Sequence, residues 1–304
     1  MKLTRKKPEE DKNMKHARRI ALVLALSLLI LCLAGCGRMT AEKLAGKMVT
    51  ATAGKVMTQM DAEMDLEMDF AVSDGEKLME MGFDIGYEMA VKMRQEPFAG
   101  YGDIKLDVSM DLLGQNVNIS SETMQLYMVL EDGKLVSYTH TDSTDSWDSQ
   151  EAPDTEAATQ TMDYSFLTQM IPEITLEEEK AVVGDREVYV IRLTMTGEQM
   201  QKALGENSAL TDALSQAGID GQIDFSALTV PAVFYVDAET FLPVQIELEI
   251  AGMGEMMQSM VTALPNMGLE GDSVQISVPV CRMVVKNISF DPVEVPALPE
   301  DIRK

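Results

Sequence analysis

The sequence predicts an α+β protein built on a long-stranded antiparallel sheet with a few helices. The chain has 304 residues, of which 46% are hydrophobic, and this is enough apolar material for a large core. From Met60 to Val72 every second residue is apolar, whereas the residues between them begin as alternating Asp and Glu. This period of two is typical of a strand with one dry face. Similar runs follow after short turns such as Asp74-Gly75, which indicates an antiparallel meander.

The N-terminus has the pattern of a secretory signal. Residues 1–19 are rich in Lys and Arg, and residues 20–33 are apolar except for Ser27. This run is about 14 residues long, shorter than the about 20 that a membrane-spanning helix needs. It ends in Leu33-Ala34-Gly35-Cys36, which resembles the lipobox of bacterial lipoproteins. The resemblance implies cleavage before Cys36, removal of residues 1–35 as a signal peptide, and a diacylglycerol group on the Cys36 thiol. Translation can start at Met1 or at Met14.

Composition limits the compartment and the partners. Residues 1–35 carry eight basic and three acidic side chains, so their removal changes the formal charge from −25 to −30. Such an acidic surface repels phosphate, so no nucleic acid partner is expected. Cys281 is the one thiol left beside Cys36, which excludes a disulfide scaffold. The expected location is the extracytoplasmic face of the cell membrane, with acylated Cys36 as the lipid anchor.

The mature chain is predicted to be a lipidated tether, residues 36–39, followed by a single domain over 40–304. Thr40 can cap a helix that runs to about Thr58. The period-two runs then predict strands at about 60–72, 79–93 and 104–112, a fourth strand that ends at Leu130, and a fifth at 135–140. Residues 141–161 are expected to be a polar loop.

The second half of the chain mixes helices and strands. A short helix from Phe166 should stop at Pro172. Strands are expected at about 174–183 and 186–195, and Thr196 with Gln199 matches a capping box for a helix over about 197–217. The remaining predicted elements are a hairpin of 229–237 and 242–250, an amphipathic helix over 253–264 and a long strand over 273–290.

The order of these elements resembles the LolA-like superfamily of lipoprotein carriers. The pattern comprises a lipobox, an N-terminal helix, a meander of long strands and helices between the later strands, over about residues 39–300. It is most similar to uncharacterised Gram-positive lipoproteins of that superfamily, which share the acidic-methionine first strand. The resemblance implies a strongly curved half-barrel that wraps helices and leaves a cavity for acyl chains. It transfers one functional residue, Cys36.

Methionine supports a ligand-binding hypothesis. The chain has 25 Met, many of them on predicted dry faces, and Met suits surfaces that accept varied apolar partners. We therefore expect a non-catalytic carrier or binding module for a lipid or other hydrophobic ligand. Its predicted lining is Met60, Met64, Met68, Phe70, Met81, Phe83, Met89, Met110, Met124 and Met128. The candidate lid is the helix that carries Met253, Met256, Met257 and Met260.

A second hypothesis is that these methionines fill an ordinary core. The protein would then be an envelope-associated interaction or structural protein whose acidic surface binds basic partners or divalent cations. Neither hypothesis includes catalysis, because the sequence has no G-x-S-x-G, Walker-A or H-E-x-x-H motif. Neither a cofactor nor a resident metal is expected. His140 is expected at a strand end and Cys281 as a small packing residue.

Overall fold

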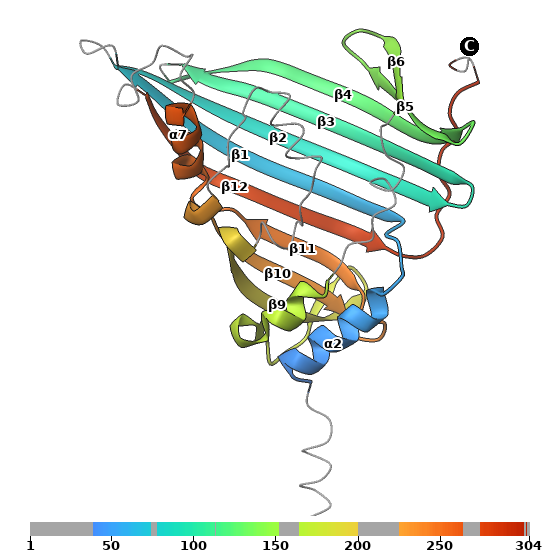
Figure 1. The fold of residues 1–304 in the computed structure, drawn as a ribbon. Helices are drawn as coiled ribbons and strands as arrows, with labels where there is room; N and C mark the ends of the chain where they lie inside the picture. Colours follow the sequence, from blue (N-terminus) through green and yellow to red (C-terminus); the bar gives the residue numbers. More distant parts are fainter. Residues whose placement is uncertain are drawn as a thin grey trace, which may run out of the picture.

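The fold is described here from a computed structural model, for residues 39–73, 78–112, 114–151, 164–199, 225–263, 274–300 and 302. The predicted signal peptide, Cys36 and most of the predicted helix over 197–217 lie outside these residues. The twelve strands formed by the described residues belong to one sheet, which is antiparallel throughout and curves around the helices (Figure 1). The predicted fold class, a curved half-barrel of α+β type, is confirmed. Within the described part of the chain, no helix is long and apolar enough to cross a membrane.

The first half of the sheet is a meander of long strands. Its elements are α2 (Ala41–Thr52), β1 (Gln59–Ser73), β2 (Leu78–Gln95), β3 (Phe98–Leu112), β4 (Gln115–Glu131), β5 (Lys134–Thr141) and β6 (Ser146–Glu151). Consecutive strands pair in register as hairpins, as the alternating sequence predicts.

The second half closes back onto β1. Its elements are α4 (Phe166–Gln169), η1 (Ile171–Glu173), β7 (Thr175–Leu176), β8 (Ala181–Val183), β9 (Arg186–Thr196), η2 (Phe225–Ala227), β10 (Thr229–Asp237), β11 (Pro243–Glu249), α7 (Met253–Ala263) and β12 (Val274–Ser289). The strand order is β6-β5-β4-β3-β2-β1-β12-β11-β10-β9-β7, with β8 paired to β9. The first and last long strands, β1 and β12, are therefore neighbours in the middle of the sheet.

Several predicted boundaries were wrong, each for a local reason. Helix α2 ends at Thr52 rather than near Thr58, because Gly54 adopts a φ of +69° and turns the chain away. Strand β3 begins at Phe98 rather than at 104, since two glycines, Gly100 and Gly102, occupy apolar positions of its pattern. The predicted loop over 141–161 contains strand β6, and the predicted strand over 174–183 is divided into β7 and β8.

The capping box at the start of the predicted 197–217 helix is confirmed. The Thr196 backbone N–H donates to Gln199 Oε1 at 2.8 Å, and the Gln199 N–H donates to Thr196 Oγ1 at 3.3 Å. Residues 197–199 are helical, and the rest of the predicted helix lies outside the described residues. The short sequence pattern was sufficient here because both bonds join residues three positions apart.

The main core lies on one face of the sheet, over the half that contains β9 to β12. Helices α2 and α4 pack over the strands β9 to β12, and the fully buried α2 side chains Leu44 and Met48 have no exposed area. They meet Ile191 and Phe234 of the sheet, which are also buried. Cys281 of β12 is buried as predicted, and burial raises the pKa of its thiol.

A second apolar cluster lies on the opposite face of the sheet. Tyr101 and Tyr127 meet edge to face with ring centres 4.9 Å apart, and Trp147 of β6 lies 5.7 Å from Tyr127. Two residues of the C-terminal tail, Leu298 and Ile302, cover this cluster. The prediction that only one face of the sheet is dry is therefore wrong over strands β3 to β6. The apolar cover also explains why residues 146–151 form a strand, since Trp147 pairs with β5 and packs on Tyr127.

The hairpin between β10 and β11 is held by a buried carboxylate. Asp237 Oδ1 accepts hydrogen bonds from the backbone N–H of Glu239 at 3.0 Å, the N–H of Thr240 at 2.7 Å and the Thr240 hydroxyl at 2.9 Å. Burial by itself raises the pKa of Asp237, but the hydrogen bonds from Thr240 and Glu239 outweigh it and hold the pKa below its usual value.

Asp237→Ala is expected to lower the free energy of unfolding by about 1–2 kcal/mol at neutral pH, because three hydrogen bonds to the carboxylate are lost. The folded-state pKa is depressed, so this stabilisation is complete above the unfolded pKa of about 3.9 and is lost as pH falls through the folded value. Urea midpoints measured at pH 7 and at lower pH check both points. Glu239→Ala, which removes an exposed carboxylate from the same turn, should change little at either pH, and an equal loss in both variants would contradict this role.

Candidate ligand-binding face

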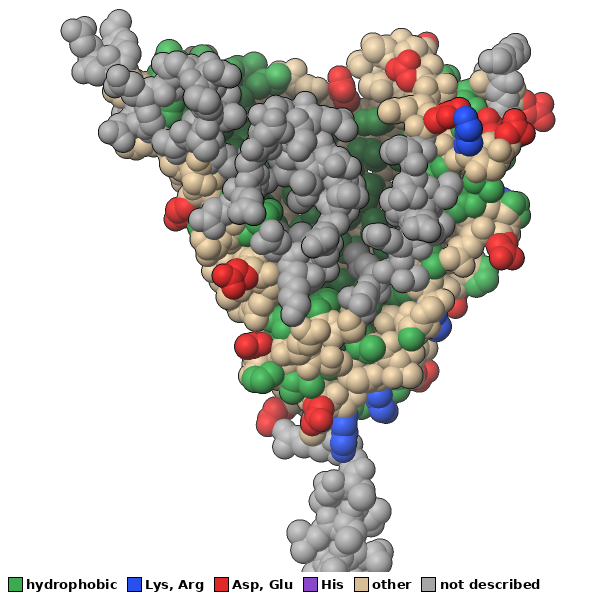
Figure 2. Space-filling model, viewed as in Figure 1, with side chains coloured by type: hydrophobic (Ala, Val, Ile, Leu, Met, Phe, Trp, Pro, Cys, Tyr) green, Lys and Arg blue, Asp and Glu red, His purple; other side chains and the backbone are tan. Residues whose placement is uncertain are grey.

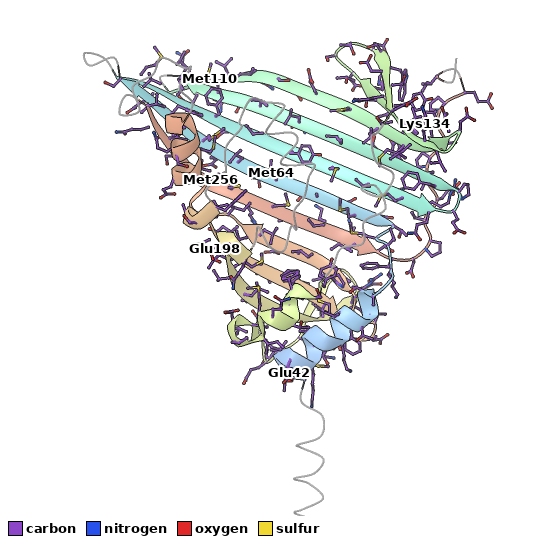
Figure 3. All side chains as sticks on the ribbon, viewed as in Figure 1. Glu42, Met64, Met110, Lys134, Glu198 and Met256 are labelled. Carbon is purple, nitrogen blue, oxygen red and sulfur yellow. The ribbon has the colours of Figure 1, made fainter. Side chains whose placement is uncertain are left out.

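The strand register places all ten predicted lining residues on one face of the sheet. Across β1, β2 and β3, Met68 lies opposite Phe83, and Phe83 lies opposite Met110. Met64 lies at the middle of the sheet and Met110 near the far end of β3, and hydrophobic side chains are visible over this part of the sheet (Figures 2 and 3). We call this surface, formed by the inward residues of β1 to β4, the methionine face. The opposite surface, which carries Asp61, Glu63, Asp65, Glu67 and Asp69 of β1, is the acidic face.

The methionine face is less buried than the main core, which lies on the same face of the sheet beside it. One cross-strand row runs in order through Met124, Ile104, Met89, Ala62, Val285, Ile246, Phe234 and Ile191. The row is half-buried at Met124 and Met89 on β4 and β2, and buried from Ala62 onward. Every predicted lining residue is half-buried, and two of them, Met60 and Met89, pack against the main core. The helices α2 and α4 thus cover the β9–β12 half of this face and leave the β2–β4 half partly exposed.

Glycines shape the methionine face where the sequence pattern is interrupted. Gly100 lies opposite Met128, and a Cβ atom on Gly100 would lie 2.8 Å from the Met128 methyl group. The missing side chain therefore leaves the space that Met128 fills. Gly102 lies on the same face, two residues along β3. These glycines were not identified from the sequence, because their role depends on which strand lies opposite.

A few polar groups also lie on the methionine face, and sequence reasoning missed them. The Tyr87 hydroxyl donates to the Met89 sulfur at 3.3 Å, and burial raises the pKa of Tyr87. Glu122 of β4 lies directly opposite Leu106, and Thr139 of β5 lies opposite Leu126. The register therefore gives the apolar surface a polar border along β4 and β5. Such groups can orient the polar end of a largely apolar molecule.

Helix α7, the candidate lid, covers an open edge of β12. Strand β11 pairs with β12 over residues 282–285, so within the described part of the chain no strand pairs with the segment from Val274 to Ile276 on that side. The Gln258 side chain replaces it: its Nε2 donates to the Val274 carbonyl at 2.8 Å, and its Oε1 accepts from the Ile276 N–H at 2.9 Å. Met256 lies on this helix at the sheet edge (Figure 3). A lid role for Met253, Met256, Met257 and Met260 stays a prediction.

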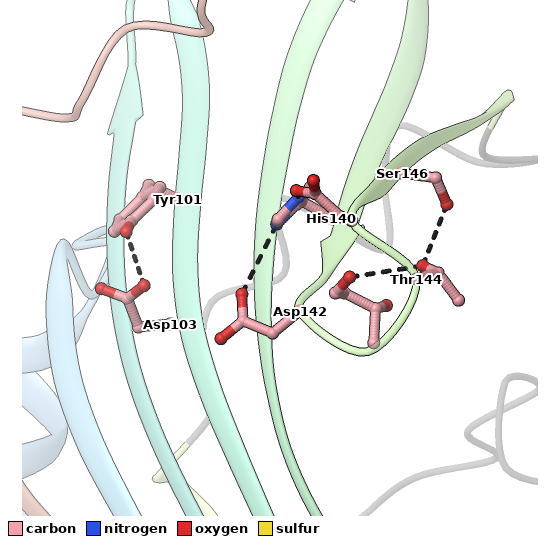
Figure 4. Close-up of polar contacts among 8 residues, drawn as sticks. Tyr101, Asp103, His140, Asp142, Thr144 and Ser146 are labelled. Carbon is pink, nitrogen blue, oxygen red and sulfur yellow. Dashed lines mark hydrogen bonds and ion pairs between the residues drawn. The ribbon is translucent and has the colours of Figure 1, made fainter.

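Near the aromatic cluster, Tyr101 and His140 contact carboxylates close to them in the sequence. Tyr101 donates to Asp103 at 2.6 Å, and the His140 ring lies 3.8 Å from Asp142 and 3.4 Å from Asp145 (Figure 4). His140 stacks on Trp147, with ring centres 4.9 Å apart, near the end of β5 as predicted. No group of three His, Cys, Asp or Glu side chains among the described residues is placed to hold a metal ion.

Comparisons with known proteins found distant similarities only. No known family model and no curated protein matches the chain. LprF from Mycobacterium bovis is 10% identical with a TM-score of 0.36, the match covering 84% of this chain and 96% of that one. A putative outer membrane lipoprotein-sorting protein domain from Vibrio parahaemolyticus is 10% identical with a TM-score of 0.20, over 82% of this chain and 89% of that one. A DUF1329 family protein from Desulfovibrio piger is also 10% identical with a TM-score of 0.20, over 83% and 92%. Similarities this low establish neither a relationship nor a ligand.

Proposed function

We propose that this protein is a lipid-anchored extracytoplasmic module that binds a lipid or another hydrophobic molecule on its methionine face, without catalysing a reaction. The anchor is the acylated Cys36, and the bound module is the single domain over residues 40–304. The lipobox pattern supports the anchor, and the half-buried methionine face supports the ligand.

The observation that carries the proposal is the change in burial along one face of the sheet. A protein with an ordinary core would bury this face along its whole length, because exposed apolar area costs about 25 cal/mol per Å². Here the residues from Met124 to Met89 are half-buried, whereas those from Ala62 to Ile191 are buried under helices. Met79 and Leu112, at the far end of β2 and β3, are 55% and 38% exposed. This partly exposed apolar surface can be covered by a ligand.

The dimensions of the face fit an extended apolar chain. From Met60 to Phe70 the face is about 33 Å long, and four strands give a width of about 14 Å. Methionine side chains are unbranched and flexible, so they can adapt to acyl chains of different length and number. Since these side chains come from four neighbouring strands, a bound chain would contact a rigid support with a deformable surface.

Met68→Asp is expected to weaken binding of a fluorescent apolar probe, such as 1-N-phenylnaphthylamine, by at least about tenfold. A carboxylate in the middle of an apolar site must lose its water shell when the probe binds, and this costs free energy. Probe titration of the full-length protein after delipidation measures the effect, and native mass spectrometry of protein from its own cells would identify the natural ligand.

The matched control is Glu67→Gln, on the same strand but on the acidic face, which should leave probe affinity unchanged. Circular dichroism would check that both variants fold. Equal probe affinity in Met68→Asp and the parent protein would contradict binding on the methionine face. If the parent protein bound no probe and no lipid, the interaction-protein hypothesis would be preferred.

A further inference from the structure

The outward face of α2 is a basic surface on a strongly acidic protein. Lys43 and Lys47 are both exposed, and their spacing of four residues puts them one above the other on the same side of the helix. With Glu42 of the same helix and Phe241 from the β10–β11 turn they line a shallow hollow of about 680 Å³, in which the two lysines outnumber the one carboxylate. The whole chain has a formal charge of −25, so this pair of lysines is a local exception.

Neither lysine is paired with a carboxylate of the described residues. Within the described residues, neither Lys43 nor Lys47 forms an ion pair, and the Lys47 ammonium lies 4.0 Å from the centre of the Phe241 ring. By contrast, Lys105 lies 2.6 Å from Asp107, and Lys134 lies 2.9 Å from Glu151. Both of the α2 lysines are therefore available to an anion outside the molecule.

The position of Lys43 does not serve helix stability. It lies in the first turn of α2, where its own backbone N–H donates to the capping hydroxyl of Thr40 at 3.2 Å. The N-terminal end of a helix dipole is positive, so a cation there is unfavourable. Glu42 in the same turn is the residue that the dipole favours. A basic side chain kept at this cost is more readily explained by an external partner.

The sequence also places this surface close to the proposed lipid anchor, and this step depends on the proposed function. Cys36 precedes Ala41, the first residue of α2, by five positions. Five residues span at most about 18 Å when fully extended, so an acylated Cys36 would hold α2 near the bilayer. Lys and Arg side chains, with some Asp and Glu side chains beside them, are visible at the narrow end of the molecule, where α2 lies (Figures 1 and 2).

We propose that the outward face of α2, with Lys43, Lys47 and the Phe241 ring beside them, rests on the anionic headgroups of the bilayer that holds the anchor. The charges are complementary, and each lysine near such a surface strengthens attachment roughly fivefold. The carboxylates of the acidic face are repelled by the same surface. The lipid would therefore attach the protein, and α2 would determine its orientation.

The experiment uses the acylated mature protein, residues 36–304, on two kinds of vesicle, phosphatidylcholine alone and phosphatidylcholine mixed with phosphatidylglycerol. Lysines are modified with a water-soluble N-hydroxysuccinimide ester, and each site is quantified by mass spectrometry. Lys43 and Lys47 should react about fivefold more slowly on the anionic vesicles, with Lys134 unchanged. High salt should remove the protection, because it screens the attraction. Equal reactivity on both kinds of vesicle would overturn the proposal.

A second measurement tests the two lysines by substitution. A polarity-sensitive dye on Thr50→Cys, an exposed position on the same hollow, should shift toward an apolar signal on anionic vesicles only. Lys43→Glu with Lys47→Glu should abolish the shift, and Lys105→Glu with Lys134→Glu, an equal change of charge elsewhere, should not. Persistence of the shift in the first pair would also refute α2 docking. Flotation tests the lipid anchor separately from the α2 surface. If the protein failed to float with phosphatidylcholine vesicles, the anchor would be disproved. Protection of the two lysines on anionic vesicles would still support the α2 surface.

Discussion

Gly252→Ala should destabilise the protein by at least about 3 kcal/mol, or prevent folding. Gly252 joins β11 to α7 with a φ of +83°, a conformation that side chains rarely adopt. A Cβ atom at this position would lie 2.0 Å from the Ala227 carbonyl oxygen and 2.8 Å from its carbonyl carbon. Both of these are backbone atoms, so the clash cannot be relieved by a side-chain rotation. Urea denaturation followed by circular dichroism would measure the loss.

Gly184→Ala is the matched control for this prediction. Gly184, in the turn between β8 and β9, has a φ of +62°, but nothing lies within 4 Å of the position of a Cβ atom. Its substitution should cost only the conformational strain, about 1 kcal/mol. If both variants lost the same stability, the close approach of Gly252 to η2 would not determine the packing of α7.

Met48→Ala and Met64→Ala are expected to differ strongly, although the chemical change is the same. Met48 of α2 is fully buried against the sheet, and Met→Ala at such a site costs about 2–5 kcal/mol. Met64 on the methionine face is half-buried, so its loss should cost only about 1 kcal/mol. Denaturation midpoints of the ligand-free variants would give the comparison.

The variants Met48→Ala and Met64→Ala also distinguish an effect on stability from an effect on ligand binding. Met64→Ala should lower the affinity for an apolar probe several-fold, whereas folded Met48→Ala should bind the probe like the parent protein. A loss of stability at Met64 as large as that at Met48 would show that the methionine face is filled by the protein itself. The ligand hypothesis would then have to be abandoned in favour of the filled-core alternative.

The acidic face needs no specific ligand to explain it. Lys105 lies between Asp107 at 2.6 Å and Glu88 at 3.7 Å, and hydrogen bonds from Lys105 and Ser121 hold the pKa of Asp107 below its usual value. Such exposed pairs contribute little to stability. The same-face residues along one strand lie about 7 Å apart, which is too far for two neighbouring carboxylates to share one cation easily. Their effect is to keep one face of a large open sheet hydrated.

The strands and the facing of their side chains were predictable because they depend on neighbours in the sequence. Alternation alone predicted β1 and β2 and placed Met64 and Phe83 on the same side. The capping box of Thr196 and Gln199 was predictable for the same reason. Strand β3 was predicted too short, since Gly100 and Gly102 have no apolar side chain to mark the pattern. Residues 146–151 were missed as a strand, since the packing of the half-buried Trp147 depends on Tyr127, which lies two strands away in β4.

By itself the sequence determined the class of fold and the orientation of the methionine residues. A period of two specifies which side of a strand each residue occupies, whatever strand lies beside it. Tertiary structure alone decided which part of that face is covered. Met89 and Ala62 are opposite each other in neighbouring strands and equally apolar in pattern, yet Ala62 is buried and Met89 is only half-buried. The difference arises because the main core under α2 and α4 extends to Ala62 across the pairing of β1 with β12, strands more than two hundred residues apart in the chain, whereas Met89 lies at the border of that core.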